Sequence, residues 1–162
     1  ERLAKAGALG RFAIDFVVIS DGSGEWSAYA IELNLRKGGT THPFLTLQFL
    51  TDGGYDAASG RFLTQQGHER HLVATDHLES DDLRALSVDD LFDVVARHGL
   101  HFDESTQTGV VFHMISCLSE CGRVGMTTVG ETPEQAMAIY ERAQRILLDE
   151  ARDARQEGRL PG

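Results

Sequence analysis

The chain has 162 residues, 41% of them hydrophobic, and a formal net charge of -10. Its length and apolar content are enough for a buried core, which excludes an intrinsically disordered chain. The acidic balance argues against a nucleic-acid partner, because there is no excess of lysine and arginine to neutralise phosphates. We find neither a signal peptide nor an apolar run of membrane-spanning length. We therefore expect a cytoplasmic protein with no membrane partner.

The first predicted strand, residues 12–19, is apolar on both faces except at Asp15, which is typical of a central, buried strand. A lone carboxylate there is costly unless it is paired, bound to metal, or satisfied by backbone N–H groups. After a turn at 21–24, residues 26–36 return antiparallel. If Ser20 opposes Ser27, Asp15 faces Glu32, and two carboxylates on one face repel unless a cation lies between them.

The returning strand, residues 26–36, alternates apolar and polar side chains, which predicts one buried and one polar face. A carboxylate and an amide on the polar face suit a hard cation such as Mg²⁺. A guanidinium farther along suits a phosphate oxygen. An ordinary polar strand face is the alternative interpretation. The polar row consists of Glu32, Asn34 and Arg36.

A glycine turn and a helix follow this strand. Gly38 and Gly39 allow a sharp turn with exposed backbone N–H groups, and Pro43 suits the first position of a helix. The N-terminus of a helix favours anions. We therefore expect a phosphate or the substrate to contact this segment, at Lys37, Gly38, Gly39, Thr40, Thr41 and His42.

The rest of the chain predicts strands near 61–64, 72–75, 108–115 and 123–129, with helices at 87–97 and 133–156. The last two strands form a second hairpin. The apolar stripe of the last helix is expected to pack against it at Val111 and Val124. Residues 65–71, which include His68 and His71, favour a solvated turn over a metal or acid–base cluster. His113 is interpreted as a core histidine, with a catalytic role as the alternative. Cys117 and Cys121 are interpreted as free thiols.

Residues 31–43, Ile-Glu-Leu-Asn-Leu-Arg-Lys-Gly-Gly-Thr-Thr-His-Pro, resemble the metal-binding strand of the ATP-grasp ligases, most of all the pheganomycin-type peptide ligases. The resemblance implies that ATP phosphorylates a carboxylate and that an amine then displaces phosphate. It also implies Mg²⁺ (or Mn²⁺) ligands at Asp15, Glu32 and Asn34, and a catalytic role for Arg36.

The resemblance further implies an α+β fold: the C-terminal portion of the ATP-grasp fold, an antiparallel hairpin plus helix, followed by a smaller α/β unit. We place the metal-binding portion at 1–58, the second unit at 59–157 and a tail at 158–162. ATP-grasp enzymes take their adenine pocket and phosphate-binding lysines from upstream segments, and few residues here precede Glu32. We therefore expect part of a larger ligase, inactive alone.

The expected partners are ATP, a carboxylate substrate, an amine substrate and an upstream ATP-grasp lobe; the sequence leaves a homo-oligomer open. Two other functions stay open. An ATP-grasp kinase shares the metal strand but phosphorylates a hydroxyl group. A non-catalytic ATP-grasp-derived domain would supply an assembly surface.

Overall fold

The computed structural model describes residues 2–8 and 10–158. The chain forms two compact units, Glu1–Leu45 and Thr46–Gly162, which we describe separately. Both units combine helices with small antiparallel sheets, so the predicted mixture of α and β structure is confirmed. The predicted domain boundary after residue 58 stays a prediction. Residues 159–162 of the predicted tail lie outside the described residues.

The first unit is a hairpin with a short helix on either side in the sequence. It contains α1 (Arg2–Lys5), β1 (Ala13–Ser20), β2 (Trp26–Asn34) and the start of α2 (Thr41–Thr51). The two strands form an antiparallel two-stranded sheet, as predicted. Their turn is shaped by Asp21, whose carboxylate accepts a 2.8 Å hydrogen bond from the backbone N–H of Ser23. Gly22 and Gly24 adopt positive φ angles of 83° and 95°, which favour glycine.

The predicted burial of the hairpin is wrong. Every residue of β1 is exposed, and so is every residue of β2 except the partly buried Asn34. Phe16 is 55% exposed and Trp26 is 69% exposed. A strand that is apolar on both faces becomes buried only when other elements cover those faces. Among the described residues β1 pairs with β2 alone. The strand whose apolar pattern predicted a central position is therefore, in the described part of the chain, one of only two strands in its sheet, and both of its faces are exposed.

The register of the hairpin departs from the predicted one near the turn and agrees with it at the open end. Ser20 pairs with Trp26 instead of Ser27. An irregularity between Asp15 and Phe16 then shifts the pairing by one residue, so that Asp15 faces Glu32 as predicted. The extra residue on β2 is Ile31, which makes this irregularity a β-bulge.

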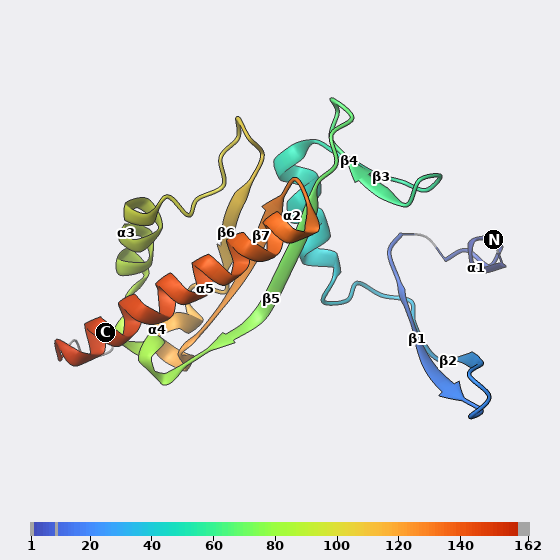
Figure 1. Ribbon diagram of the computed structural model, residues 1–162, viewed down its shortest axis with the longest axis horizontal. Helices are drawn as coiled ribbons and strands as arrows, with labels where there is room; N and C mark the ends of the chain where they lie inside the picture. Colours follow the sequence, from blue (N-terminus) through green and yellow to red (C-terminus); the bar gives the residue numbers. More distant parts are fainter. Residues whose placement is uncertain (1, 9, 159–162) are drawn as a thin grey trace. The chain divides into compact units, whose positions relative to one another are not determined.

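The second unit is built on a three-stranded antiparallel sheet in the order β5-β7-β6, with α5 running along it (Figure 1). The predicted second hairpin is present as β6 and β7, but a short helix, α4, replaces the predicted turn between them. The elements of the unit after α2 are β3 (Gly54–Asp56), β4 (Arg61–Leu63), β5 (His71–Glu79), the 3₁₀ helix η1 (Asp81–Ala85), α3 (Val88–His98), β6 (Gly109–His113), α4 (Cys117–Cys121), β7 (Arg123–Gly130) and α5 (Pro133–Gln156).

Local signals in the sequence start both long helices of this unit. Ser87 and Asp90 form a reciprocal capping box at the start of α3, and Gly99 ends that helix in the left-handed conformation. Thr132 caps α5 by accepting a hydrogen bond from the backbone N–H of Gln135. These caps fix where the two amphipathic helices begin.

The core lies between the sheet and the helices, and β7 is its centre, with every residue but the first buried. The predicted stripe of α5 is confirmed, because Leu147 and Ala143 are fully buried and Ile146 packs against the core. On β6 the core residue is Val110 and not Val111, because alternation directs Val111 to the other face. The largest fully buried side chains are Leu83, Leu91, Leu118, Met126 and Leu147.

Cys117 and Cys121, at the two ends of α4, are free cysteines, in agreement with the interpretation from the sequence.

Among the described residues, no helix is both long enough and apolar enough to cross a membrane.

We expect Leu147→Ala to lower the free energy of unfolding by about 2–5 kcal/mol, because it leaves a cavity in a fully buried part of the core. Urea denaturation followed by circular dichroism measures the change. The matched control is Met137→Ala on the same helix, where the side chain is 44% exposed and the expected change is about 0.5 kcal/mol or less. Equal losses for both variants would contradict the assigned core.

Candidate functional site

The open end of the β1–β2 hairpin brings the three predicted metal ligands together. Asp15 and Glu32 are direct cross-strand partners and therefore lie on one face of the sheet. Asn34 follows two residues after Glu32 on the same strand, so it shares that face. Its Nδ2 atom donates a 3.3 Å hydrogen bond to Oδ2 of Asp15. The predicted clustering of these three side chains is thus present.

This arrangement sets two like charges side by side. Directly opposed residues in a sheet have Cβ atoms about 4.5–5.5 Å apart. Two carboxylates at such a distance repel by about 1 kcal/mol in water, and by more where solvent is excluded. The Asn34 amide relieves only part of this repulsion, because it donates to Asp15 alone of the two acids. A cation between the carboxylates would remove it.

The chemistry of the donor set fits Mg²⁺. This ion takes oxygen ligands and usually binds through one or two carboxylates, with water and substrate phosphates completing its shell. Asp15 and Glu32 offer carboxylate oxygens, and the Asn34 amide carries an oxygen next to the nitrogen that contacts Asp15. Among the described residues, no three or more histidines, cysteines, aspartates or glutamates form a metal site. The hairpin set could therefore act only as a partial shell.

Arg36 lies beyond the strand that was predicted to carry it. β2 ends at Asn34, and Arg36 occupies a bend two residues later. Its Nη1 atom donates a long hydrogen bond of 3.5 Å to the carbonyl oxygen of Lys37. The side chains of Arg36 and Lys37 are both exposed. Both cations also follow Glu32 closely in the sequence. Such exposed cations can reach an anionic ligand without losing a buried partner.

The turn before α2 differs in detail from the prediction. The helix begins at Thr41, two residues before Pro43. The amide of Gly38 donates to Oγ1 of Thr41 at 3.1 Å, and the amide of Thr41 donates to the carbonyl oxygen of Gly38 at 3.0 Å. The amide of Gly38 is therefore used within the turn, whereas an exposed N–H group was expected. Gly39, Thr40 and His42 remain exposed.

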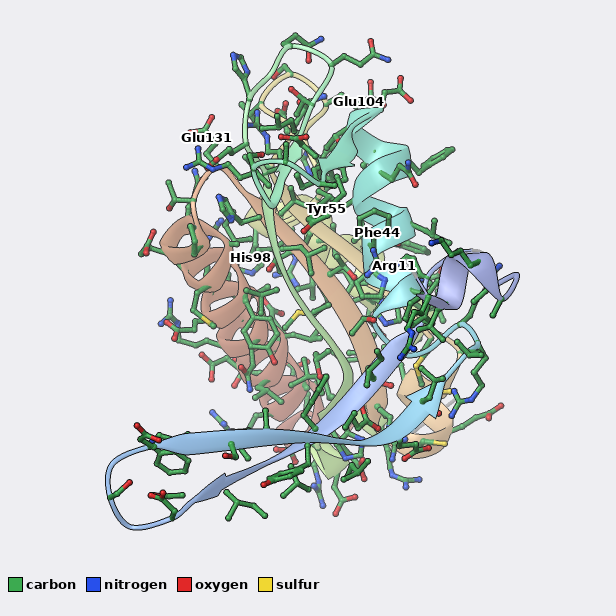
Figure 2. All side chains as sticks on the ribbon, turned by 90° about the vertical axis from the view of Figure 1, so that its right-hand side faces the viewer. Arg11, Phe44, Tyr55, His98, Glu104 and Glu131 are labelled. Carbon is green, nitrogen blue, oxygen red and sulfur yellow. The ribbon has the colours of Figure 1, made fainter. Side chains whose placement is uncertain are left out.

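An aromatic contact ties the start of the hairpin to this helix. The guanidinium of Arg11 lies over the ring of Phe44, 3.8 Å from its centre (Figure 2). Such cation–π contacts contribute about 0.5–1 kcal/mol at exposed sites. Arg11 precedes β1 and Phe44 is in α2, so the contact holds the two ends of the hairpin segment together.

The segment from His68 to His71 contributes to structure. Arg70 is 7% exposed, and it donates hydrogen bonds to the carbonyl oxygens of Glu69, at 2.7 Å, and Thr106, at 3.0 Å. Glu69 pairs with Arg61 at 2.6 Å and lies 3.5 Å from His71. The buried Arg70 corrects the prediction of a wholly solvated turn.

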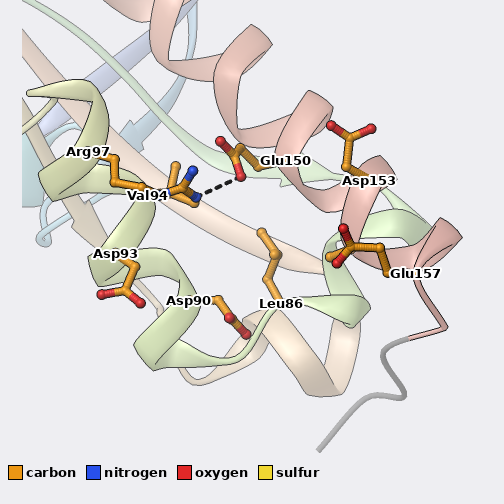
Figure 3. Close-up of a pocket in the computed structure, with 9 residues that line it drawn as sticks. Leu86, Asp90, Asp93, Val94, Arg97, Glu150, Asp153 and Glu157 are labelled. Carbon is orange, nitrogen blue, oxygen red and sulfur yellow. Dashed lines mark hydrogen bonds and ion pairs between the residues drawn. The ribbon is translucent and has the colours of Figure 1, made fainter.

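The second unit has a polar cavity of about 460 Å³ between α3 and α5, which the sequence interpretation missed (Figure 3). Glu150 accepts one hydrogen bond there from Arg97, at 2.8 Å, and its other carboxylate oxygen lies 2.8 Å from Nε2 of His98. These bonds, that of Arg97 above all, lower the pKa of the Glu150 carboxyl below its ordinary value. The acidic residues repeated along both helices were the available signal. The remaining carboxylates that line the cavity are Asp90, Asp93, Asp153 and Glu157.

We expect Asp15→Asn and Glu32→Gln each to weaken the binding of Mn²⁺ to this chain by about tenfold or more, because each removes one of two carboxylate ligands. Electron paramagnetic resonance of free Mn²⁺ during a titration measures the affinity. Glu25→Gln, which changes an exposed acid just before β2, is the matched control and should leave the affinity unchanged. Equal behaviour of all three variants would contradict a metal site at this end of the hairpin.

Comparisons with known proteins agree with the sequence pattern. The PGM1 C-terminal domain family matches residues 90–143, which lie in the second unit. Over 148 residues the chain is 32% identical to L-propargylglycine–L-glutamate ligase of Streptantibioticus cattleyicolor. The similarity covers 91% of this chain, and the chain spans 30% of the length of that ligase. No solved structure matches the chain. The resemblance to the ATP-grasp ligases is therefore confirmed: over most of its length, the chain is similar to a segment of such a ligase.

Proposed function

We propose that this chain is the metal- and phosphate-binding part of an ATP-dependent carboxylate–amine ligase. The observation that carries the proposal is the similarity to L-propargylglycine–L-glutamate ligase, whose name describes the joining of two amino acids. The geometry of the hairpin also supports the proposal, because Asp15 faces Glu32 and Asn34 lies beside them. Because the chain spans 30% of that ligase, only the substrate classes, a carboxylate and an amine, are carried over.

In the proposed reaction a carboxylate oxygen of the first substrate attacks the γ-phosphorus of ATP, and ADP leaves. The amine of the second substrate then attacks the carbonyl carbon of the acyl phosphate, and an amide and phosphate are released. Mg²⁺ (or Mn²⁺), when bound, neutralises charge on the phosphate oxygens. Asp15, Glu32 and Asn34 would hold it at the open end of the hairpin, with the upstream ATP-grasp lobe supplying the adenine pocket.

Arg36 and the following turn would hold the transferred phosphoryl group. The Arg36 guanidinium can donate paired hydrogen bonds to phosphate oxygens, and stabilises charge that develops during transfer. Lys37 and His42 add exposed side chains close in sequence, and the amides of Gly39 and Thr40 lie in the same exposed turn. Thr41 and Gly38, whose polar groups bond to each other, would fix the shape of that turn rather than contact ligand.

A non-catalytic assembly domain is the second candidate, and the exposed apolar hairpin favours it. Ile31 is 64% exposed and Tyr29 is 56% exposed, as on a surface used for association. This function needs no phosphate chemistry, so it predicts that changes at Arg36 leave the activity of the longer protein intact.

We expect Arg36→Ala to lower kcat of an enzyme containing this chain by about 10²-fold or more, while the affinity for ATP changes little, because the charge acts on the developing phosphate. Steady-state release of ADP measures both quantities. Arg11→Ala, which removes a cation on Phe44, is the control for a general loss of positive charge. Full activity of the Arg36→Ala enzyme would support the assembly role instead.

Hydroxylamine separates the ligase from an ATP-grasp kinase. It attacks an acyl phosphate to give a hydroxamate, which ferric chloride detects by its colour, and it leaves a phosphate ester intact. We expect hydroxamate that depends on both ATP and the carboxylate substrate when the enzyme containing this chain is assayed without amine. The 162-residue chain alone should give none and should bind ATP weakly in calorimetry, because phosphoryl transfer requires positioned phosphates. Phosphate ester without hydroxamate would identify a kinase.

A further inference from the structure

The β-bulge of the hairpin lies at the acidic pair itself. Phe16 pairs with Ala30 on the turn side of the bulge, and Asp15 pairs with Glu32 on the other side. β2 therefore has one residue more than β1 at this point, and that residue is Ile31. Bulges increase the local twist of a strand and change the direction of its side chains.

The bulge decides which face of the sheet carries the acids. If the pairing of the turn side continued without interruption, Asp15 would oppose Ile31 and Ile14 would oppose Glu32. Opposed residues share a face and successive residues alternate, so the two carboxylates would then lie on opposite faces. We name this hypothetical pairing the regular register, and the observed pairing the bulged register.

The bulged register also sorts the apolar residues. Ile14 pairs with Leu33, on the same face as Phe16 and Ala30, so that this face is apolar along the hairpin except at Ser20 beside the turn. In the regular register Glu32 would interrupt that face, and Asp15 would stand alone among apolar residues on the other. Two features disfavour the bulged register. Ile31 has no cross-strand partner in it, and the two opposed carboxylates repel each other.

The two registers share the turn and the five pairs nearest to it, from Ser20–Trp26 to Phe16–Ala30. They differ only in the last few residues of the hairpin. Register is strongly specified where one face is buried and weakly specified where both faces are open to solvent. Both faces of this hairpin are exposed, so a modest interaction at its open end can decide between the registers.

We propose that a divalent cation bound by Asp15 and Glu32 selects the bulged register, and that Ile31 is the positioning residue of the metal site. The inference rests on the proposed metal role of these acids. The cation cancels the repulsion in the bulged register, and it gains no second carboxylate in the regular one. Binding at the acidic pair and completion of the apolar face are therefore coupled, although they occur on opposite sides of the sheet.

Cross-strand disulfides report the register directly. Ile14→Cys with Leu33→Cys places opposed thiols in the bulged register, and Ala13→Cys with Leu33→Cys does so in the regular register. Directly opposed residues lie within the Cα separation that a disulfide allows. Both pairs are made in the full chain with Cys117→Ser and Cys121→Ser, and dipyridyl disulfide is the oxidant. Val18→Cys with Ala28→Cys, on the turn side, is the control pair.

We expect Mg²⁺, compared with NaCl of equal ionic strength, to raise the cross-linking rate of the 14–33 pair by about two- to fivefold, which is the size of a cross-strand charge effect. The rate of the 13–33 pair should fall, and that of the 18–28 pair should stay constant. Asp15→Asn removes the repulsion and should abolish the effect of Mg²⁺ on the 14–33 pair. Deletion of Ile31 makes the same pairing regular, so that variant should cross-link 14–33 fast with or without Mg²⁺.

A parallel Mn²⁺ titration by electron paramagnetic resonance distinguishes failure of this inference from failure of the proposed function. If Mn²⁺ binding depends on Asp15 and Glu32 but the cross-linking rates do not change with Mg²⁺, the coupling between metal binding and register is wrong and the metal role stands. Binding that does not depend on these acids would overturn both. A rise in the 13–33 rate with Mg²⁺ would also contradict the inference.

Discussion

The alternation of side chains along a strand is the constraint on which the candidate site depends. Two strands place a chosen pair of residues on one face only when the strands are paired in the correct register. The pairing that starts at the turn leads to the regular register, in which the two acids lie on opposite faces. The acids share a face only in the bulged register. One extra residue, Ile31, produces the bulged register. The result is a hairpin in which the two carboxylates share one face and Ile14, Phe16 and Leu33 share the other, even though the turn by itself would separate Asp15 from Glu32.

The second unit is organised by a different constraint, the close packing of a single central strand. β7 is hydrogen-bonded on both edges and nearly all its residues are buried. The need for a glycine at position 125 follows from close packing: a Cβ there would collide with Nε2 of His113, so the imidazole occupies the space that any larger residue would need. This arrangement agrees with a structural role for His113. The PGM1 C-terminal domain match begins and ends within this unit, and so concerns the scaffold rather than the acidic pair.

The elements that follow from local signals were predictable from the sequence. Ser87 and Thr132 start helices because their side chains satisfy backbone N–H groups, and this depends on neighbouring residues alone. The meeting of Asp15 with Glu32 was also predicted, although through a register that is wrong near the turn. Burial of β1 could not be predicted, because an apolar strand does not specify what covers it. The ion pair between Arg97 and Glu150 was missed for a related reason, since it joins residues far apart in the sequence.

The exposed hairpin has a consequence for the colloidal behaviour of the chain. Among the described residues β1 and β2 pair only with each other, so each has one unpaired backbone edge, and both faces beside those edges are rich in aromatic and branched side chains. Such edges are templates for pairing between molecules. The net charge of -10 opposes this by mutual repulsion between copies. Solubility of the isolated chain thus depends on long-range charge, which salt screens within about 10 Å at 0.1 M.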